Sequence, residues 1–124
     1  MRIFKNKVFD KWAAKEGLTD DALRAAVSEI ERGLVDAELG GHVLKKRVAL
    51  VGRGKSGGAR TLLAYRVKDK AFFVYGFAKN ARSNIKPDEL RALKMLAAQL
   101  LSYSDKELTK ATKDRVLVEV SNDG

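Results

Sequence analysis

The residues best suited to chemistry in this chain are basic ones between Lys45 and Lys70, where nine cations accompany a single acid, Asp69. The nine are Lys45, Lys46, Arg47, Arg53, Lys55, Arg60, Arg66, Lys68 and Lys70. Positive charge at this density favours an anionic partner, and a chain of phosphodiesters is the anion that a row of cations fits best. The segment therefore predicts a surface that binds nucleic acid. The alternative is that the charges only solvate exposed strands.

Three of these cations, Lys45, Arg47 and Arg60, form the candidate catalytic set. Alternate residues of a strand share a face, so Lys45 and Arg47 project together, and an antiparallel neighbouring strand adds Arg60 and Arg66. Arginine can grip phosphate oxygens and stabilise a pentacovalent transition state, and lysine can transfer protons. Such a site can cleave RNA without a metal or a histidine, because the ribose 2′-OH supplies the nucleophile. Electrostatic binding of nucleic acid without cleavage is the alternative at this point.

The other motifs favour no different chemistry. Residues Gly54–Ser56 look like the end of a phosphate-binding loop, but Ala49 stands where that motif needs glycine. A strand rather than a helix is predicted to follow, so we reject nucleotide hydrolysis. His42 is the only histidine and no carboxylate pair stands near the basic segment, which argues against a metal site and a catalytic triad. We expect no metal and no cofactor. The aromatic side chains that could stack on bases are expected to pack instead: Trp12, Tyr75 and Tyr103.

Length and composition predict one globular domain, residues 1–124. The net charge is +9, but apolar residues make up an ordinary 45%, so the charge is not a sign of disorder. Residues 10–38 hold eight acids and four bases, which predicts a near-neutral helical layer beside a positive sheet. The chain has no cysteine, no apolar run of membrane-spanning length and no signal-peptide pattern at its start. We expect a cytoplasmic protein that makes no membrane contact.

Patterns along the chain predict an α+β fold: an antiparallel sheet of three to five strands, two N-terminal helices and a C-terminal helix. Gly17 is expected to end the first helix, Thr19 to cap the second, and Pro87 to stand in the first turn of the third. Ser104 and Glu107 have the spacing of a capping box that opens a further short helix. Strands are expected at 2–5, 44–51, 59–67, 71–78 and 115–120, with a Gly-rich hairpin connection at 52–58.

Two segments, LKKRVALVGRGKSGGARTLLAYRV and KAFFVYGFAKNARSNIKPDELRALK, together resemble the RelE/ParE superfamily of type II toxin–antitoxin toxins, and most of all its RelE/HigB-like branch. The resemblance covers residues 4–101 as a core and leaves 104–124 as a C-terminal extension. It implies a compact RelE-like domain that cuts mRNA in the ribosomal A site. It also implies, as partners, the ribosome with its mRNA and a cognate antitoxin, expected to be a small helix-turn-helix protein. It allows a homodimer.

The resemblance carries over to particular residues. The paired basic residues on one strand of the family match Lys45 and Arg47, and the basic residue on the following strand matches Arg60. Two positions depart from the family: Asn80 stands where an arginine is common, and Lys86 stands near the place of a tyrosine that some members use.

The leading hypothesis is a ribosome-dependent mRNA endonuclease in which Lys45 transfers a proton, Arg47 positions the phosphate and Arg60 stabilises the transition state. The residues expected to hold RNA around them are Lys46, Arg53, Lys55, Arg66, Lys79, Asn80 and Arg82. Two other hypotheses stay open. One is a ParE-like toxin that inhibits DNA gyrase by protein contact, and the other is a non-catalytic RNA-binding domain.

Overall fold

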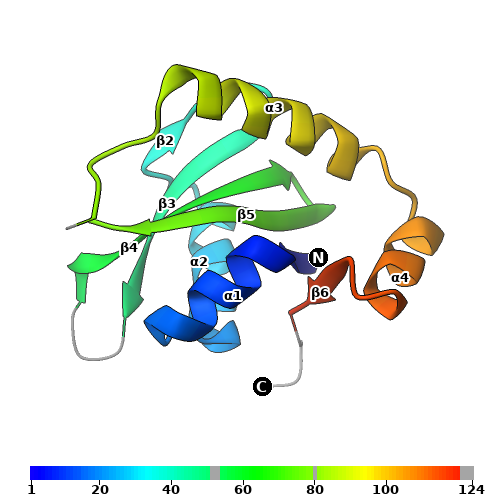
Figure 1. Cartoon of the computed structure of the whole chain (residues 1–124), viewed down its shortest axis with the longest axis horizontal. Coiled ribbons are helices and arrows are strands. Elements are labelled where there is room, and N and C mark those ends of the chain that lie inside the picture. Colours follow the sequence, from blue (N-terminus) through cyan, green and yellow to red (C-terminus); the bar gives the residue numbers. More distant parts are fainter. Residues whose placement is uncertain (51–53, 80, 121–124) are drawn as a thin grey trace.

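The computed structural model describes residues 1–50, 54–79 and 81–120, the side chains of 54–57 excepted. Within these ranges the chain forms six strands and four helices (Figure 1). The strands are β1 (Arg2–Asn6), β2 (Ala37–Glu38), β3 (Val43–Leu50), β4 (Gly54–Arg66), β5 (Lys70–Ala78) and β6 (Leu117–Glu119). The helices are α1 (Lys7–Glu16), α2 (Asp20–Glu31), α3 (Pro87–Leu101) and α4 (Asp105–Lys113).

The strands form one sheet in the order β2-β3-β4-β5-β1-β6. Paired neighbours run antiparallel, except that β1 runs parallel to β5. Helices α1 and α2 pack on one face of the sheet and α3 and α4 on the other, as Figure 1 shows. The predicted α+β class is confirmed. The sheet has one strand more than the predicted maximum in the described part of the chain, and α3 lies on the face opposite the N-terminal helices.

The helices begin and end where the local sequence predicts. Gly17 ends α1 in the left-handed region, at φ 74°, which glycine adopts without steric cost. The Thr19 side chain accepts a hydrogen bond from the Ala22 backbone N–H at 3.2 Å and so caps α2. Ser104 and Glu107 form the reciprocal capping box of α4, with contacts of 2.9 and 3.1 Å. These three predictions are confirmed.

The larger core lies between the sheet and the α1–α2 pair. Alternate residues of β3, β4 and β5 point into it, because strand side chains alternate between faces. Each large apolar side chain that is buried here contributes roughly 1.5–3 kcal/mol of transfer free energy. Its fully or nearly fully buried members include Phe9, Leu23, Val27, Leu44, Val48, Leu63 and Phe73.

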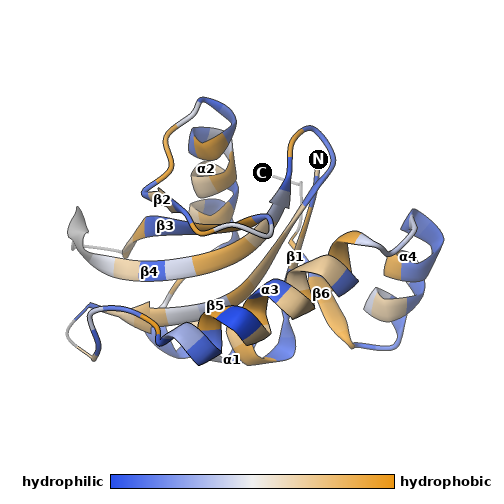
Figure 2. Ribbon diagram, turned by 90° about the horizontal axis from the view of Figure 1, so that it is seen from above, coloured by the Kyte–Doolittle hydropathy of each residue, from blue (hydrophilic) through white to orange (hydrophobic). Residues whose placement is uncertain are grey.

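A second core lies under α3 and α4. The rings of Phe4 in β1 and Phe72 in β5 stack at 5.1 Å there, beneath the buried Leu101 and Leu108. Figure 2 shows the consequence in hydropathy: the ribbon of β5 is mostly hydrophobic, whereas α4 is largely hydrophilic with a narrow apolar stripe. Among the described helices none has the length and apolar character needed to cross a membrane.

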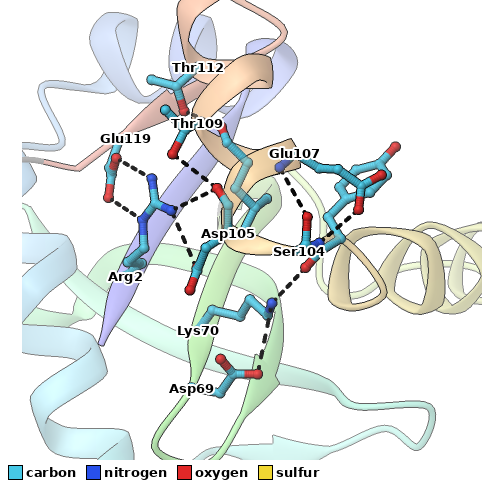
Figure 3. A network of polar contacts seen from close by, with 11 residues as sticks. Arg2, Asp69, Lys70, Ser104, Asp105, Glu107, Thr109, Thr112 and Glu119 are labelled. Carbon is cyan, nitrogen blue, oxygen red and sulfur yellow. Dashed lines mark hydrogen bonds and ion pairs between the residues drawn. The ribbon is translucent and has the colours of Figure 1, made fainter.

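The C-terminal residues are tied to the sheet by a polar network that Figure 3 shows. The guanidinium of Arg2 donates to both carboxylate oxygens of Glu119 at 2.9 Å and contacts Asp105. Lys70, which is buried, donates to the Tyr103 carbonyl at 2.8 Å. The strand predicted at 115–120 is present as β6, which pairs antiparallel with β1.

Two features depart from the predicted elements. Strand β4 begins at Gly54, so more than half of the expected Gly-rich connection at 52–58 belongs to a strand. The two-residue strand β2 was not predicted, and it pairs with β3 at Ala37–Lys45 and Glu38–Leu44. Two residues are too few for an alternating pattern to be visible in a sequence.

We predict that Gly76→Ala destabilises the protein by roughly 1–3 kcal/mol, because the added methyl overpacks the core. A Cβ at residue 76 of β5 would lie 2.2 Å from Cζ3 of Trp12 in α1, well inside van der Waals contact. The measurement is the free energy of unfolding in urea. Trp12→Ala should remove most of the added cost in the double variant, and an equal cost in both backgrounds would contradict this account.

Candidate nucleic-acid interface

Strand register places the three candidate catalytic residues together. In the β3–β4 ladder Arg47 stands directly opposite Arg60, and Lys45 stands opposite Leu62. Their side chains share a face with Val43 and the α3–α4 core, while Leu44 and Val48 point to the other face. Helix α3 packs over the half of this face that holds Val43, and α4 packs beside β6. Lys45 and Arg60 are half-buried and Arg47 is exposed in the half that remains. The register therefore brings Lys45, Arg47 and Arg60 together on one face, as the sequence predicts.

The Arg47–Arg60 pair is unusual because like charges directly opposite each other destabilise a sheet. Cross-strand partners have Cβ atoms roughly 4.5–5.5 Å apart, so the two arginine side chains leave the sheet side by side. Moreover, Nη1 of Arg60 is buried and has no hydrogen-bond partner; it is the one such side-chain atom in the described part of the chain. A buried donor without an acceptor costs roughly 1–3 kcal/mol, and more when charged. An anion between the two arginines would remove both costs.

In the described part of the chain one acid contacts Arg47, and that acid is Asp36, which precedes β2. The Asp36 carboxylate accepts from the backbone N–H of Arg47 at 2.5 Å and from its Nε at 2.8 Å. Burial by itself would raise the pKa of the Asp36 carboxyl, but these hydrogen bonds from Arg47 lower it below its usual value. The carboxylate is therefore charged at neutral pH. No described residue accepts a hydrogen bond from the Nη groups of Arg47, which leaves both of them for another acceptor.

The side chains of Lys45 and Lys79 have no ion pair among the described residues, and Lys79 is exposed at the end of β5. Each ammonium offers three donors. Lys45 therefore lies beside the arginine pair with its donors available, whereas Lys79 extends the positive charge beyond β5.

Arg82 is nearly saturated with partners. It donates to both oxygens of Glu89, at 2.6 and 3.1 Å, to the Tyr75 hydroxyl at 3.1 Å and to the Asn84 carbonyl at 2.8 Å. Its guanidinium also lies over the rings of Tyr75 and Phe77. Four of its five N–H groups are thus engaged, so its role is to fix the β5–α3 connection beside the site. Tyr75, expected to be buried, is half-buried with its hydroxyl in this cluster.

Two of the predicted RNA-holding residues lie elsewhere. Lys46 projects from the opposite face of β3, is 4% exposed and pairs with Glu29 of α2 at 2.8 Å. Arg66 shares the face of Arg60 but lies at the far end of β4, where it donates to the Leu101 carbonyl at 3.0 Å. Lys46 and Arg66 thus have partners within the protein for their charged groups. Of the remaining residues, Arg53 and Asn80 lie outside the described residues, and Lys55 is described by its backbone alone.

Sequence reasoning missed two acids at this surface, Asp36 and Glu89. Asp36 lies 11 positions before Arg47, and no periodic pattern links them. Glu89 could have been found from its spacing, because an acid at the third position of a helix commonly accepts from the backbone N–H of the residue before the helix. In the structure it accepts from the Lys86 N–H at 2.7 Å. Its second bond, to Arg82, depends on the path of the chain before α3.

Fold and surface together define a small, strongly basic α+β protein with a cluster of cations on one face of its sheet. A family comparison identifies the protein more closely. Residues 1–120 match the model described as the RelE toxin of the RelE / RelB toxin–antitoxin system, and the chain belongs to this family. The predicted RelE/ParE membership is confirmed, and the match extends through β6, beyond the predicted core of 4–101. A search of curated proteins finds no significant match.

Family membership makes this chain a toxin of a toxin–antitoxin system, with an antitoxin as its partner. Toxins of this family are generally endoribonucleases that inhibit translation. The described surface agrees with that class, because its guanidinium and ammonium groups can donate hydrogen bonds to the oxygens of a phosphodiester.

We predict that the Arg82–Glu89 pair stabilises the fold with a defined pH dependence. Hydrogen bonds from Arg82, and then from the Lys86 N–H, lower the pKa of Glu89 from 4.5 to about 2. Because the folded pKa is the lower one, the stabilisation is fully present above about pH 5 and is lost as the pH falls toward 2. The measurement is the unfolding free energy of wild type minus that of Glu89→Gln across this range.

The matched control for this prediction is Glu38→Gln, an exposed carboxylate in β2. A wild-type advantage over Glu89→Gln that stays constant from neutral pH to about pH 3 would contradict the pairing.

Proposed function

We propose that this toxin is a ribosome-dependent mRNA endonuclease whose catalytic residues are Lys45, Arg47 and Arg60. The observation that supports the proposal is the buried, partnerless Nη1 of Arg60 directly across the ladder from Arg47. A guanidinium nitrogen without an acceptor can bind a phosphate oxygen once the side chain turns to expose it, and such a contact is most useful where the charge on that oxygen grows during reaction.

In the proposed reaction the scissile phosphate lies between the two arginines. The ribose 2′-oxygen attacks phosphorus and loses its proton to solvent, giving a pentacovalent species whose extra charge Arg60 stabilises. Arg47 holds a non-bridging oxygen through its Nη groups. The bond to the 5′-oxygen then breaks, and the ammonium of Lys45 donates a proton to that leaving oxygen. The products are a 2′,3′-cyclic phosphate and a 5′-hydroxyl.

The remaining cations supply binding rather than chemistry in this proposal. Lys79 is exposed and available for an RNA phosphate, and Arg53, Lys55 and Asn80 are proposed RNA contacts from sequence alone. Arg82 shapes the surface through Glu89 and Tyr75. We leave Lys46 and Arg66 out of the contact set because Glu29 and the Leu101 carbonyl hold them. The ribosome as a partner, the single domain 1–124, the homodimer and the cytoplasmic location stay predictions.

The test is primer extension on a reporter mRNA in a purified translation system, with and without ribosomes. Wild type should cut at A-site codons only when ribosomes are present. Arg60→Ala should slow cleavage by roughly 100- to 1,000-fold, the scale for one transition-state donor. Arg60→Lys should recover part of the loss, since it restores charge without the planar fork.

Arg32→Ala is the matched control, because Arg32 is exposed at the C-terminal end of α2, on the other side of the sheet. It should cut at the wild-type rate. Intact message with every variant would overturn the endonuclease proposal. Loss of DNA supercoiling in that case would identify a gyrase inhibitor, and salt-dependent RNA binding alone would identify a non-catalytic RNA-binding domain.

A further inference from the structure

We propose that Asp36 is a positioning residue: it fixes the guanidinium of Arg47 with both Nη groups facing the phosphate. This inference rests on the proposed function, because the phosphate that Arg47 would bind is the scissile phosphate of the RNA. It is carried by contacts that exist without RNA.

The two oxygens of Asp36 bind two different parts of Arg47. Oδ2 accepts from the backbone N–H at 2.5 Å and Oδ1 from Nε at 2.8 Å, so the carboxylate spans the residue from main chain to guanidinium. Asp36 is itself anchored, because its backbone N–H donates to the Lys45 carbonyl at 3.2 Å. Strand β2 begins at the next residue and pairs with β3. The carboxylate therefore cannot follow Arg47 if that side chain swings away.

The exposure of the two side chains shows which end of the pair is offered to a ligand. The Asp36 side chain keeps 19% of its accessible surface, whereas that of Arg47 keeps 47%. The carboxylate is thus the less accessible of the two side chains, and the guanidinium is the more accessible. Because Nε is the one guanidinium nitrogen that a described residue binds, the edge formed by the two Nη groups can make a bidentate contact with two phosphate oxygens.

Arg82 offers the contrasting arrangement. Its acid, Glu89, takes both Nη groups and leaves no edge for a phosphate. Asp36 takes the Nε side instead. An acid that merely neutralised Arg47 could bind at either edge, and an acid that holds β2 to β3 would need only the backbone N–H. The added bond to Nε is what sets the direction of the guanidinium.

A positioning acid makes a prediction opposite in sign to simple electrostatics. Removing a negative charge beside an anion site strengthens anion binding by Coulomb attraction alone. Removing a positioning acid weakens it, because Arg47 loses its aligned rotamer. We therefore expect Asp36→Ala to bind inorganic phosphate at least about threefold more weakly than wild type. In Glu38→Ala, which removes an exposed acid two residues away, we expect equal or tighter binding.

Phosphate affinity is measured by NMR titration of the free toxin, following backbone amide signals of β3 and β4, which every folded variant retains. The Arg47 Nε–H signal is a separate readout of the contact with Asp36. That signal should be sharp and protected from exchange in wild type and lost in Asp36→Ala. Asp36→Asn should be intermediate, because its amide oxygen can still accept from Nε while its NH₂ opposes the backbone N–H. It also keeps the proposal testable if Asp36→Ala fails to fold, since tighter phosphate binding by Asp36→Asn than by wild type would overturn the proposal.

Cleavage on programmed ribosomes gives a second readout. Asp36→Ala should slow single-turnover cleavage by roughly 10- to 100-fold, and should add nothing further in an Arg47→Ala background. Equal slowing in both backgrounds would mean that Asp36 acts by holding the fold, and would overturn the proposal. If wild type leaves mRNA intact while Asp36→Ala still weakens phosphate binding, the endonuclease proposal fails and the positioning role stands.

Discussion

The register between β3 and β4 is the constraint on which both the core and the charged face depend. The pairing that places Leu44 and Val48 beneath the N-terminal helices necessarily places Arg47 opposite Arg60. A slip of one residue would move the cations into the core and the leucine to the surface. Apolar burial on one face therefore maintains charge repulsion on the other. Lys46 is the exception on the core face, and Glu29 compensates it.

Arg47, Arg60 and Arg82, the arginines described near this surface, carry the same charge but differ in which of their donors remain unused. Arg82 is satisfied by Glu89, Tyr75 and a carbonyl, Arg47 is bound along one edge, and Arg60 keeps a buried nitrogen without any acceptor. The number and direction of unused donors thus separate Arg82 from the two proposed phosphate contacts, Arg47 and Arg60. Net charge alone, which is high over the whole chain, does not make this distinction.

Sequence predicted the features that depend on near neighbours. Strand alternation gave the shared face of Lys45, Arg47 and Arg60, and capping chemistry gave the helix boundaries at Gly17 and Thr19. The misses depend on contacts that no local period encodes. Lys46 reads as one more surface cation until α2 brings Glu29 to it, and Asp36 reads as a loop acid until β2 folds back on β3. Tertiary packing determines which basic side chains have partners within the protein. The charged face could therefore be predicted from the sequence, but not which of its residues are available to bind a ligand.

The position of β1 in the sheet has a consequence for how the toxin is made. This first strand lies between β5 and β6, and Arg2 bonds to Glu119, 117 positions later. While the chain is being synthesised, both neighbours of β1 are still missing, so its backbone donors and acceptors stay open through most of translation. Strand β6, which pairs with the open edge of β1, becomes available only once residue 119 has left the exit tunnel. Completion of the sheet therefore has to wait for β6, the last strand in the described part of the chain, although β1 is the first strand to be made.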